Sequence, residues 1–227
     1  MEVAFLKPVG NPRVKICCIA SIEEAWLAIK YGAAAVGLVS EMPSGPGPIP
    51  EELIAEIAKN IPPSVSSFLL TSKQDPLEII KQHRRCGTSV IQLVDKLEIG
   101  DYEELRIALP GIRLVQVVHV VDEKALDEAE NVAPYVDAIL LDSGNPDLVV
   151  KQLGGTGRKH NWILSRQIRE KVHLPVFLAG GLTSDNVLEG LKQVQPFAVD
   201  VCNGVRTDNE LDECKLSAFF DAMNSYS

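Results

Sequence analysis

The sequence lacks three features that would assign it to a nucleic acid, a membrane or the secretory route. It has no block of Lys or Arg, and 31 acidic against 22 basic side chains leave a net charge of −9, so we expect no nucleic acid partner. No apolar run approaches the roughly 18 residues that cross a bilayer, so we expect no membrane partner. Residues 1–8 have neither a basic start nor a sustained apolar core, which argues against a signal peptide.

The sequence has few cysteines, and their spacing indicates no pairs. The five cysteines, at positions 17, 18, 86, 202 and 214, form no Cys-x-x-Cys motif and leave one over, which predicts reduced thiols and a cytoplasmic location. We interpret Cys86, Cys202 and Cys214 as structural thiols. The histidines at 83, 160 and 173 have no zinc-like spacing, so we expect no metal site.

What the sequence does contain is a repeated alternation of two patterns. Its 227 residues are 46% apolar and 23% charged, which is globular composition. Runs rich in β-branched residues alternate with stretches whose apolar residues recur every three or four positions. The predicted strands cover residues 14–20, 34–40, 65–70, 89–94, 113–121, 137–141, 175–178 and 198–202, and the predicted helices cover residues 22–31, 51–60, 76–85, 102–109, 123–131, 162–171, 184–193 and 212–223.

Three of the predicted helix starts carry capping signals. Ser21 with Glu24 has the pattern of a capping box. Asp75 precedes Pro76, which suits the first helical position. Asn161 is a suitable cap for the helix that begins at residue 162.

Strand–helix alternation of this kind has two main solutions, an open doubly wound sheet and a closed (β/α)8 barrel. Continuous apolar runs such as residues 138–141 favour the barrel, whose strands are buried on both faces. The one stretch rich in Pro and Gly, residues 43–50, falls where a strand-to-helix loop is expected. We therefore predict a single (β/α)8 TIM-barrel domain over residues 1–227, with Trp26 packing the first helix against the barrel.

Glycines follow the sixth, seventh and eighth predicted strands. In such a barrel the active site lies on loops at the carboxyl ends of the strands, and phosphate binds near the last two. Glycine lets backbone N–H groups approach an anion closely. A single glycine after a strand is usually plain turn chemistry, but three adjacent glycine loops predict a phosphate site formed by Gly155, Thr156, Gly157, Gly180, Gly181, Asn203 and Gly204.

Two reactive side chains end predicted strand runs. Cys17 ends the run of residues 14–17, and Asp142 ends the run of residues 139–142. In a barrel both would lie at the catalytic rim, where a thiolate and a carboxylic acid could act as base and acid. Taken singly, a strand-end cysteine is usually a small buried apolar group and a strand-end aspartate usually caps a loop, so the residues alone leave both readings open.

Several short segments keep a distinctive order and spacing along nearly the whole chain. They are Lys15-Ile16-Cys17, Ile91-Gln92-Leu93, Leu141-Asp142, Gly154 through Trp162, Leu178 through Thr183 with Asn186-Val187, and Val199-Asp200-Val201 with Gly204-Val205. Together they resemble the phosphoribosylanthranilate isomerase family of tryptophan biosynthesis. The segments of the carboxyl-terminal half are the more specific ones.

The resemblance implies a (β/α)8 barrel that catalyses a metal-free Amadori rearrangement of N-(5′-phosphoribosyl)anthranilate, from aminoaldose to aminoketose. No cofactor is expected, because the substrate's own nitrogen serves as the electron sink. Asp142 would be the general acid that protonates the furanose ring oxygen, and Cys17 the general base that removes the C2′ proton. For this pair to act near neutral pH, we expect their environments to shift the pKa values of the acid and the thiol toward each other.

The sequence departs from the family where the aromatic part of the substrate would bind. Gly47 stands at the position of the family's arginine, which holds the anthranilate carboxylate, so the residue that binds this carboxylate is unknown. A contact of that kind contributes about 1.5–3 kcal/mol. Arg13, Arg158 and Arg206 are candidates to replace it. Further departures are Cys18 for glycine, Val94-Asp95 for His-Gly, His119 for arginine, Arg206 for an acidic residue, and His160-Asn161 for Phe-Asp.

These departures leave three functions open. The leading hypothesis is an isomerase of the phosphoribosylanthranilate type. The first alternative is an enzyme with the same mechanism that acts on a different phosphosugar amine. The second is a barrel that binds a phosphorylated metabolite without turnover. In each case the expected partner is a small phosphorylated sugar, and the sequence gives no indication of the oligomeric state.

Overall fold

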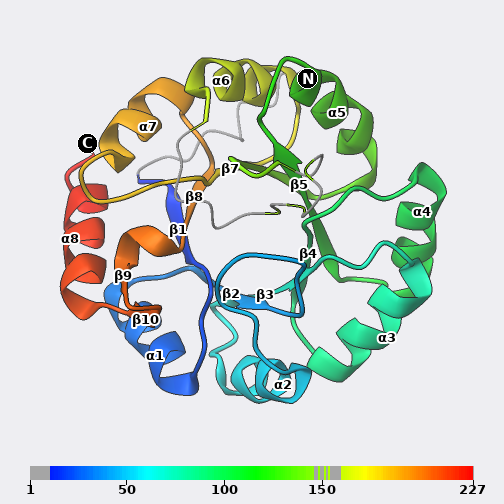
Figure 1. Ribbon diagram of the computed structural model, residues 1–227, viewed down its shortest axis with the longest axis horizontal. Helices are drawn as coiled ribbons and strands as arrows, with labels where there is room; N and C mark the ends of the chain where they lie inside the picture. Colours follow the sequence, from blue (N-terminus) through cyan, green and yellow to red (C-terminus); the bar gives the residue numbers. More distant parts are fainter. Residues whose placement is uncertain (1–10, 146–147, 149–150, 152, 154–159, 227) are drawn as a thin grey trace.

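The computed structural model describes residues 11–145, 148, 151, 153 and 160–226. Eight parallel strands close into a barrel in chain order, and the last strand pairs with the first (Figure 1). The α-helices of the described residues surround this barrel (Figure 1). The predicted (β/α)8 barrel is therefore confirmed.

The barrel elements follow the predicted alternation closely. The strands are β1 (Arg13–Ile16), β2 (Ala35–Val39), β3 (Ser66–Thr71), β4 (Val90–Leu93), β5 (Arg113–His119), β6 (Ala138–Asp142), β7 (Val176–Leu178) and β8 (Ala198–Val201). The helices are α1 (Ile22–Tyr31), α2 (Glu51–Asn60), α3 (Pro76–Cys86), α4 (Ile99–Ala108), α5 (Lys124–Val132), α6 (Trp162–Lys171), α7 (Val187–Val194) and α8 (Glu213–Asn224). Short additions are the 3₁₀ turns η2 (Ala133–Tyr135) and η3 (Asn203–Val205) and the strands β9 (Arg206–Thr207) and β10 (Glu210–Leu211).

The predicted capping residues set three helix starts. The Ser21 hydroxyl accepts from the Glu24 N–H at 3.1 Å, and the Glu24 carboxylate accepts from the Ala20 N–H at 2.9 Å. Asp75 and Asn161 each accept from two N–H groups in the first turn of the following helix. These bonds satisfy amide groups that have no partner within the helix. The bounds of α1, α2 and α6 agree with the prediction residue for residue.

The first strand is shorter than predicted. It was expected to cover residues 14–20, but β1 ends at Ile16. The Cys17 N–H still donates to the Val201 carbonyl at 2.8 Å. Cys18 then adopts a left-handed conformation with φ 62°, which turns the chain out of the barrel wall. The strand therefore ends immediately before the predicted catalytic base.

A short hairpin that was not predicted interrupts the connection from β8 to α8. Strands β9 and β10 pair antiparallel, and Figure 1 places them on the α1 side of the barrel. Asp208 and Asn209 form the turn with φ values of 51° and 67°. Asp and Asn tolerate this left-handed backbone, so a two-residue Asp-Asn loop is a suitable hairpin turn.

The helices contact the barrel through small and aliphatic side chains. On α1 the buried residues are Ala25 and Ala28. Trp26 is 50% exposed, so the prediction that it packs against the barrel is wrong. One residue advances a helix by about 100°, which turns position 26 away from the face that Ala25 buries. Among the described residues, no helix is long and apolar enough to span a membrane.

Candidate active site

A cavity of about 200 Å³ lies at the carboxyl ends of the strands, and we call it the rim cavity. Cys17 enters it after β1, and Asp142 enters it from the end of β6. Four of the predicted phosphate residues line the same cavity, namely Gly180, Gly181, Asn203 and Gly204. The structure therefore brings both predicted catalytic side chains and these four residues together. Gly155, Thr156 and Gly157 lie outside the described residues.

The loops after β7 and β8 pack directly on each other. Gly180 and Gly181 have φ values of 80° and 64°, which favour glycine. A Cβ atom on Gly204 would lie 1.9 Å from the Leu182 carbonyl oxygen, so only glycine fits there. Asn186 stabilises the loop after β7 by donating to the Gly181 carbonyl at 2.9 Å. This close backbone packing forms one wall of the rim cavity.

The Cys17 thiol is buried and lines the rim cavity. A Cβ atom on Gly37 of β2 would lie 2.8 Å from the Cys17 sulfur, so glycine leaves room for the thiol. A hydrogen bond with the Cys18 thiol, together with burial, raises the pKa of Cys17 well above its usual value, although the Lys15 charge opposes the shift. The expectation that its surroundings lower the pKa of this thiol is therefore wrong.

A buried ion pair lies beside the Cys17 thiol. Lys15 and Asp200 are register neighbours on β1 and β8, and their charged atoms are 2.9 Å apart. Burial disfavours the ammonium, but the Asp200 carboxylate outweighs it and raises the pKa of Lys15. Asp200 also lines the rim cavity. The sequence analysis assigned neither residue a role, although two opposite charges within otherwise apolar strands are a signal for an inward-facing pair.

The carboxylate of Asp142 is held by the residue that follows it. Its Oδ1 atom accepts from the Ser143 N–H at 2.7 Å. Its register neighbour on β5 is His119, whose Nε2 lies 3.0 Å from the Val94 carbonyl oxygen of the β4 loop. In the described part of the chain, no three His, Cys, Asp or Glu side chains are arranged to hold a metal ion.

Of the three arginines named as replacements for the absent loop arginine, the two that the structure describes do not line the rim cavity. Arg13 begins β1 at the opposite end of the barrel and is exposed. Arg206 is buried, and both of its Nη atoms are engaged elsewhere. Arg158 lies outside the described residues. The described lining of the cavity contains the carboxylates Asp142 and Asp200 and no Lys or Arg.

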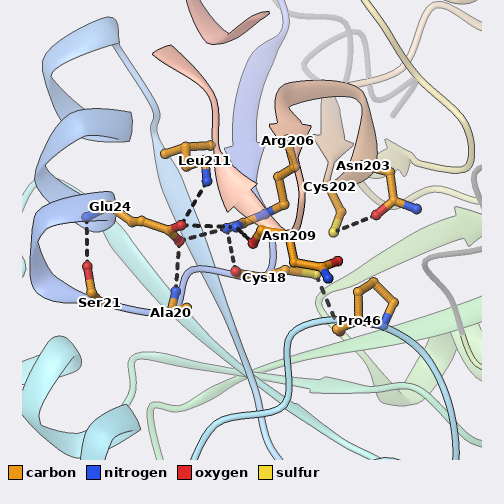
Figure 2. Close-up of polar contacts among 10 residues, drawn as sticks. All are labelled: Cys18, Ala20, Ser21, Glu24, Pro46, Cys202, Asn203, Arg206, Asn209 and Leu211. Atoms are coloured by element: carbon orange, nitrogen blue, oxygen red, sulfur yellow. Dashed lines mark hydrogen bonds and ion pairs between the residues drawn. The ribbon is translucent and has the colours of Figure 1, made fainter.

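Arg206 instead ties the loop after β1 to the loop after β8 (Figure 2). Its two Nη atoms donate to the Glu24 carboxylate at 3.0 and 2.7 Å. The same guanidinium donates to the carbonyls of Asn209 and Cys18. Burial raises the pKa of Glu24, but Arg206 and the N–H groups of Ala20 and Leu211 together outweigh it, and the net shift is downward. The Cys18 peptide, which follows the predicted base, is thus anchored by a charged group.

Two of the departures from the family are in direct contact. Gly47 has φ 85°, and a Cβ atom on it would lie 2.6 Å from the Cβ atom of Cys18. The Cys18 sulfur lies 3.7 Å from the Pro46 carbonyl, on the same loop (Figure 2). The side chain at position 18 therefore occupies the space that a side chain at position 47 would need.

The closed parallel barrel and the cavity at its strand ends define a (β/α)8-barrel protein of the kind whose chemistry lies on the strand-to-helix loops. Comparison with protein families gives a match over residues 14–222 to the family described as N-(5′-phosphoribosyl)anthranilate (PRA) isomerase. The chain therefore belongs to the N-(5′-phosphoribosyl)anthranilate isomerase family.

Individual relatives agree with this family. A Haloferax volcanii protein named N-(5′-phosphoribosyl)anthranilate isomerase is 37% identical over 215 residues, covering 94% of this chain and 93% of that protein. A Methanocella arvoryzae protein of the same name is 32% identical over 204 residues, covering 90% and 93%. The crystal structure of phosphoribosyl anthranilate isomerase from Thermotoga maritima has a TM-score of 0.80 at 28% identity and covers 93% of this chain and 98% of its own.

A further solved structure of this kind carries a ligand. It is phosphoribosyl anthranilate isomerase in complex with reduced 1-(o-carboxyphenylamino)-1-deoxyribulose 5-phosphate. Its TM-score is 0.77 at 26% identity, and the match covers 93% of this chain and 98% of that chain.

Proposed function

We propose that the protein catalyses the Amadori rearrangement of N-(5′-phosphoribosyl)anthranilate to its aminoketose, with Asp142 as general acid and Cys17 as general base. The observation that carries the proposal is that both side chains line one cavity of about 200 Å³ beside the glycine loops. Membership of the isomerase family supports the reaction class. The expected setting is tryptophan biosynthesis.

In the first step Asp142 donates its proton to the furanose ring oxygen. The bond between C1′ and that oxygen breaks, and its electron pair stays on the oxygen. The lone pair of the anthranilate nitrogen forms a double bond to C1′, which gives a cationic iminium. Asp142 is left as a carboxylate, and general acid catalysis of this kind contributes about 10²- to 10⁴-fold to the rate.

In the second step Cys17, as a thiolate, removes the C2′ proton. The C–H electron pair forms the C1′–C2′ double bond, and the C–N π pair returns to nitrogen. The resulting enol becomes the ketose when C1′ gains a proton and the C2′ hydroxyl loses one. A thiol with a raised pKa is a strong base once ionised, and the positive iminium and the nearby Lys15 favour that ionisation.

Substrate binding is assigned to the loops around the rim cavity. Backbone N–H groups of the loops after β6, β7 and β8 would hold the 5′-phosphate, through Gly155, Thr156, Gly157, Gly180, Gly181, Asn203 and Gly204. An anion held by backbone N–H groups needs no side-chain cation. The anthranilate carboxylate has no cation partner among the described lining residues, so we expect weaker binding of this end of the substrate.

The test is to follow the loss of phosphoribosylanthranilate fluorescence with purified protein. We expect Cys17→Ser and Asp142→Asn each to lose at least about 100-fold in kcat. The matched controls are Cys214→Ser, an exposed thiol, and Asp208→Asn, at a turn position that suits both residues. Both controls should retain the activity of the parent.

Turnover that survives both catalytic substitutions would discard the assigned acid and base. A parent without turnover that still binds ribose 5-phosphate would favour the altered-substrate or non-catalytic alternatives. Rescue of a tryptophan auxotroph provides the cellular version of the same test.

A further inference from the structure

His160 lies against the predicted general acid without lining the rim cavity. It stands at the end of the β6–α6 loop, directly before the cap of α6. The Nδ1 atom of His160, the Oγ atom of Ser143 and the Oδ1 atom of Asp142 lie 2.9, 3.0 and 3.1 Å from one point, the site of a Cβ atom on Gly180. The histidine Nδ1 and the aspartate Oδ1 are therefore within about 6 Å of each other.

Hydrogen bonds on the other side of the ring favour one tautomer. His160 Nε2 lies 2.7 Å from the Ser165 hydroxyl oxygen, and Ser165 is completely buried. That hydroxyl donates its single hydrogen to the Asn161 carbonyl at 3.2 Å. With its hydrogen on that carbonyl, the hydroxyl accepts from His160, and in this arrangement the ring proton is on Nε2 and Nδ1 carries a bare lone pair.

The Nδ1 lone pair accepts no hydrogen bond from the described residues. Nδ1 is buried and has no hydrogen-bond partner among them, an arrangement that costs free energy and calls for an explanation. Burial lowers the pKa of His160 to about 4, although the charge of Asp142 acts in the opposite direction. The ring is therefore neutral at pH 7.

We propose that His160 is a positioning residue for Asp142. Before substrate binds, the carboxylic acid form of Asp142 donates its O–H to the unprotonated Nδ1 directly or through one water, and when substrate binds the same O–H turns to the furanose ring oxygen. A hydrogen bond made only by the protonated form favours that form. After Asp142 has protonated the substrate, its carboxylate and Nδ1 are both acceptors, so the arrangement favours return of a proton to Asp142. This role rests on the proposed function, in which Asp142 is the general acid.

Three substitutions of His160 separate the two ring nitrogens. His160→Asn keeps a polar acceptor near the Nδ1 position, whereas His160→Gln keeps only one near Nε2, toward Ser165. His160→Phe keeps neither. We expect the Gln and Phe variants to lose at least tenfold in kcat with KM within twofold of the parent, because His160 does not line the cavity. The Asn variant should recover kcat to within about threefold of the parent.

The exposed His173 supplies the matched control, since His173→Gln should leave kcat and KM unchanged. A Gln variant with the parent's kcat, or an Asn variant no better than Phe, would overturn the proposal. A melting temperature close to that of the parent establishes that each variant is folded.

A second measurement needs no turnover. The chain has four histidines, so ¹⁵N-histidine NMR of the parent, with His160→Asn to identify the signal, reports the tautomer. We expect an unprotonated Nδ1 at pH 7 whose chemical shift changes in Asp142→Asn. A proton on Nδ1, or no response to Asp142→Asn, would overturn the proposal even in a protein without isomerase activity. An inactive parent with the expected spectrum would reject the proposed function and retain the contact.

Discussion

The contact between Cys18 and Gly47 leads to a test of why the family's loop arginine is absent. In Gly47→Ala the new Cβ atom would lie 2.6 Å from the Cys18 Cβ and 3.1 Å from its Cα and sulfur. Overpacking of this kind costs about 1–3 kcal/mol, and the left-handed φ of 85° adds about 1–2 kcal/mol for a non-glycine residue. The variant should therefore melt several degrees below the parent, at about 2–4 °C per kcal/mol for this chain length.

The double-mutant cycle isolates the steric term. Cys18→Gly removes the Cβ and sulfur atoms that the new methyl group would meet, so the pair Cys18→Gly and Gly47→Ala should retain only the cost of the left-handed φ. Urea unfolding of the four proteins measures the free energies. We expect a coupling of about 1–3 kcal/mol, and values additive to within about 0.5 kcal/mol would refute the reasoning.

The same double-mutant cycle with arginine at position 47 tests substrate binding. Gly47→Arg alone should be destabilised in the same way as Gly47→Ala. Combined with Cys18→Gly, the arginine has space, and a charge-assisted contact of about 1.5–3 kcal/mol should lower KM for phosphoribosylanthranilate by roughly tenfold or more. An unchanged KM in a folded double variant would show that the anthranilate carboxylate binds elsewhere.

Three other substitutions test the surroundings of the rim cavity. Gly204→Ala places a methyl group 1.9 Å from a backbone carbonyl oxygen. The affinity for ribose 5-phosphate, measured by calorimetry, should therefore fall at least tenfold. An unchanged affinity would contradict the packing argument. Arg206 lowers the pKa of Glu24. The ion pair therefore stabilises the folded state above the unfolded-state pKa of about 4.3, and this stabilisation is lost as pH falls through the folded-state pKa. In urea unfolding at pH 3–6, the free energy of unfolding should fall less steeply with decreasing pH in Glu24→Gln than in the parent, and equal slopes would refute this argument. Lys15→Met leaves Asp200 buried without its partner and should cost about 3–5 kcal/mol, most of which Lys15→Met with Asp200→Leu should recover in the same unfolding assay.

Most of the barrel could be predicted from local signals in the sequence. The starts of α1 and α6 follow from Ser21 and Asn161, whose side chains cap amide groups only two or three residues away. The end of β1 could not be predicted in the same way. The left-handed Cys18 is held by Arg206, which lies 188 residues further along the chain, and no local pattern reports a contact at that separation.

In the candidate site, too, some features could be predicted from the sequence and others could not. That Cys17 and Asp142 face one cavity follows from the barrel rule, because the carboxyl ends of parallel strands meet at one rim. The pairing of Lys15 with Asp200 and the upward shift in the pKa of Cys17 depend on which side chains are buried beside each other. Those relations arise from packing across the barrel, and spacing along the chain does not reveal them. The catalytic roles of Cys17 and Asp142 stay predictions until they are tested.

The seam between β1 and β8 has a consequence for how the protein is made. The strand that leads to Cys17 leaves the ribosome before the other barrel strands, whereas its neighbour β8 and the anchoring Arg206 follow all the rest. A nascent chain that stops before residue 206 therefore has the Cys17 thiol but lacks the arginine that anchors the loop after it. The surroundings of Cys17 are therefore complete only after β8 and Arg206 have been synthesised and the two ends of the barrel have met.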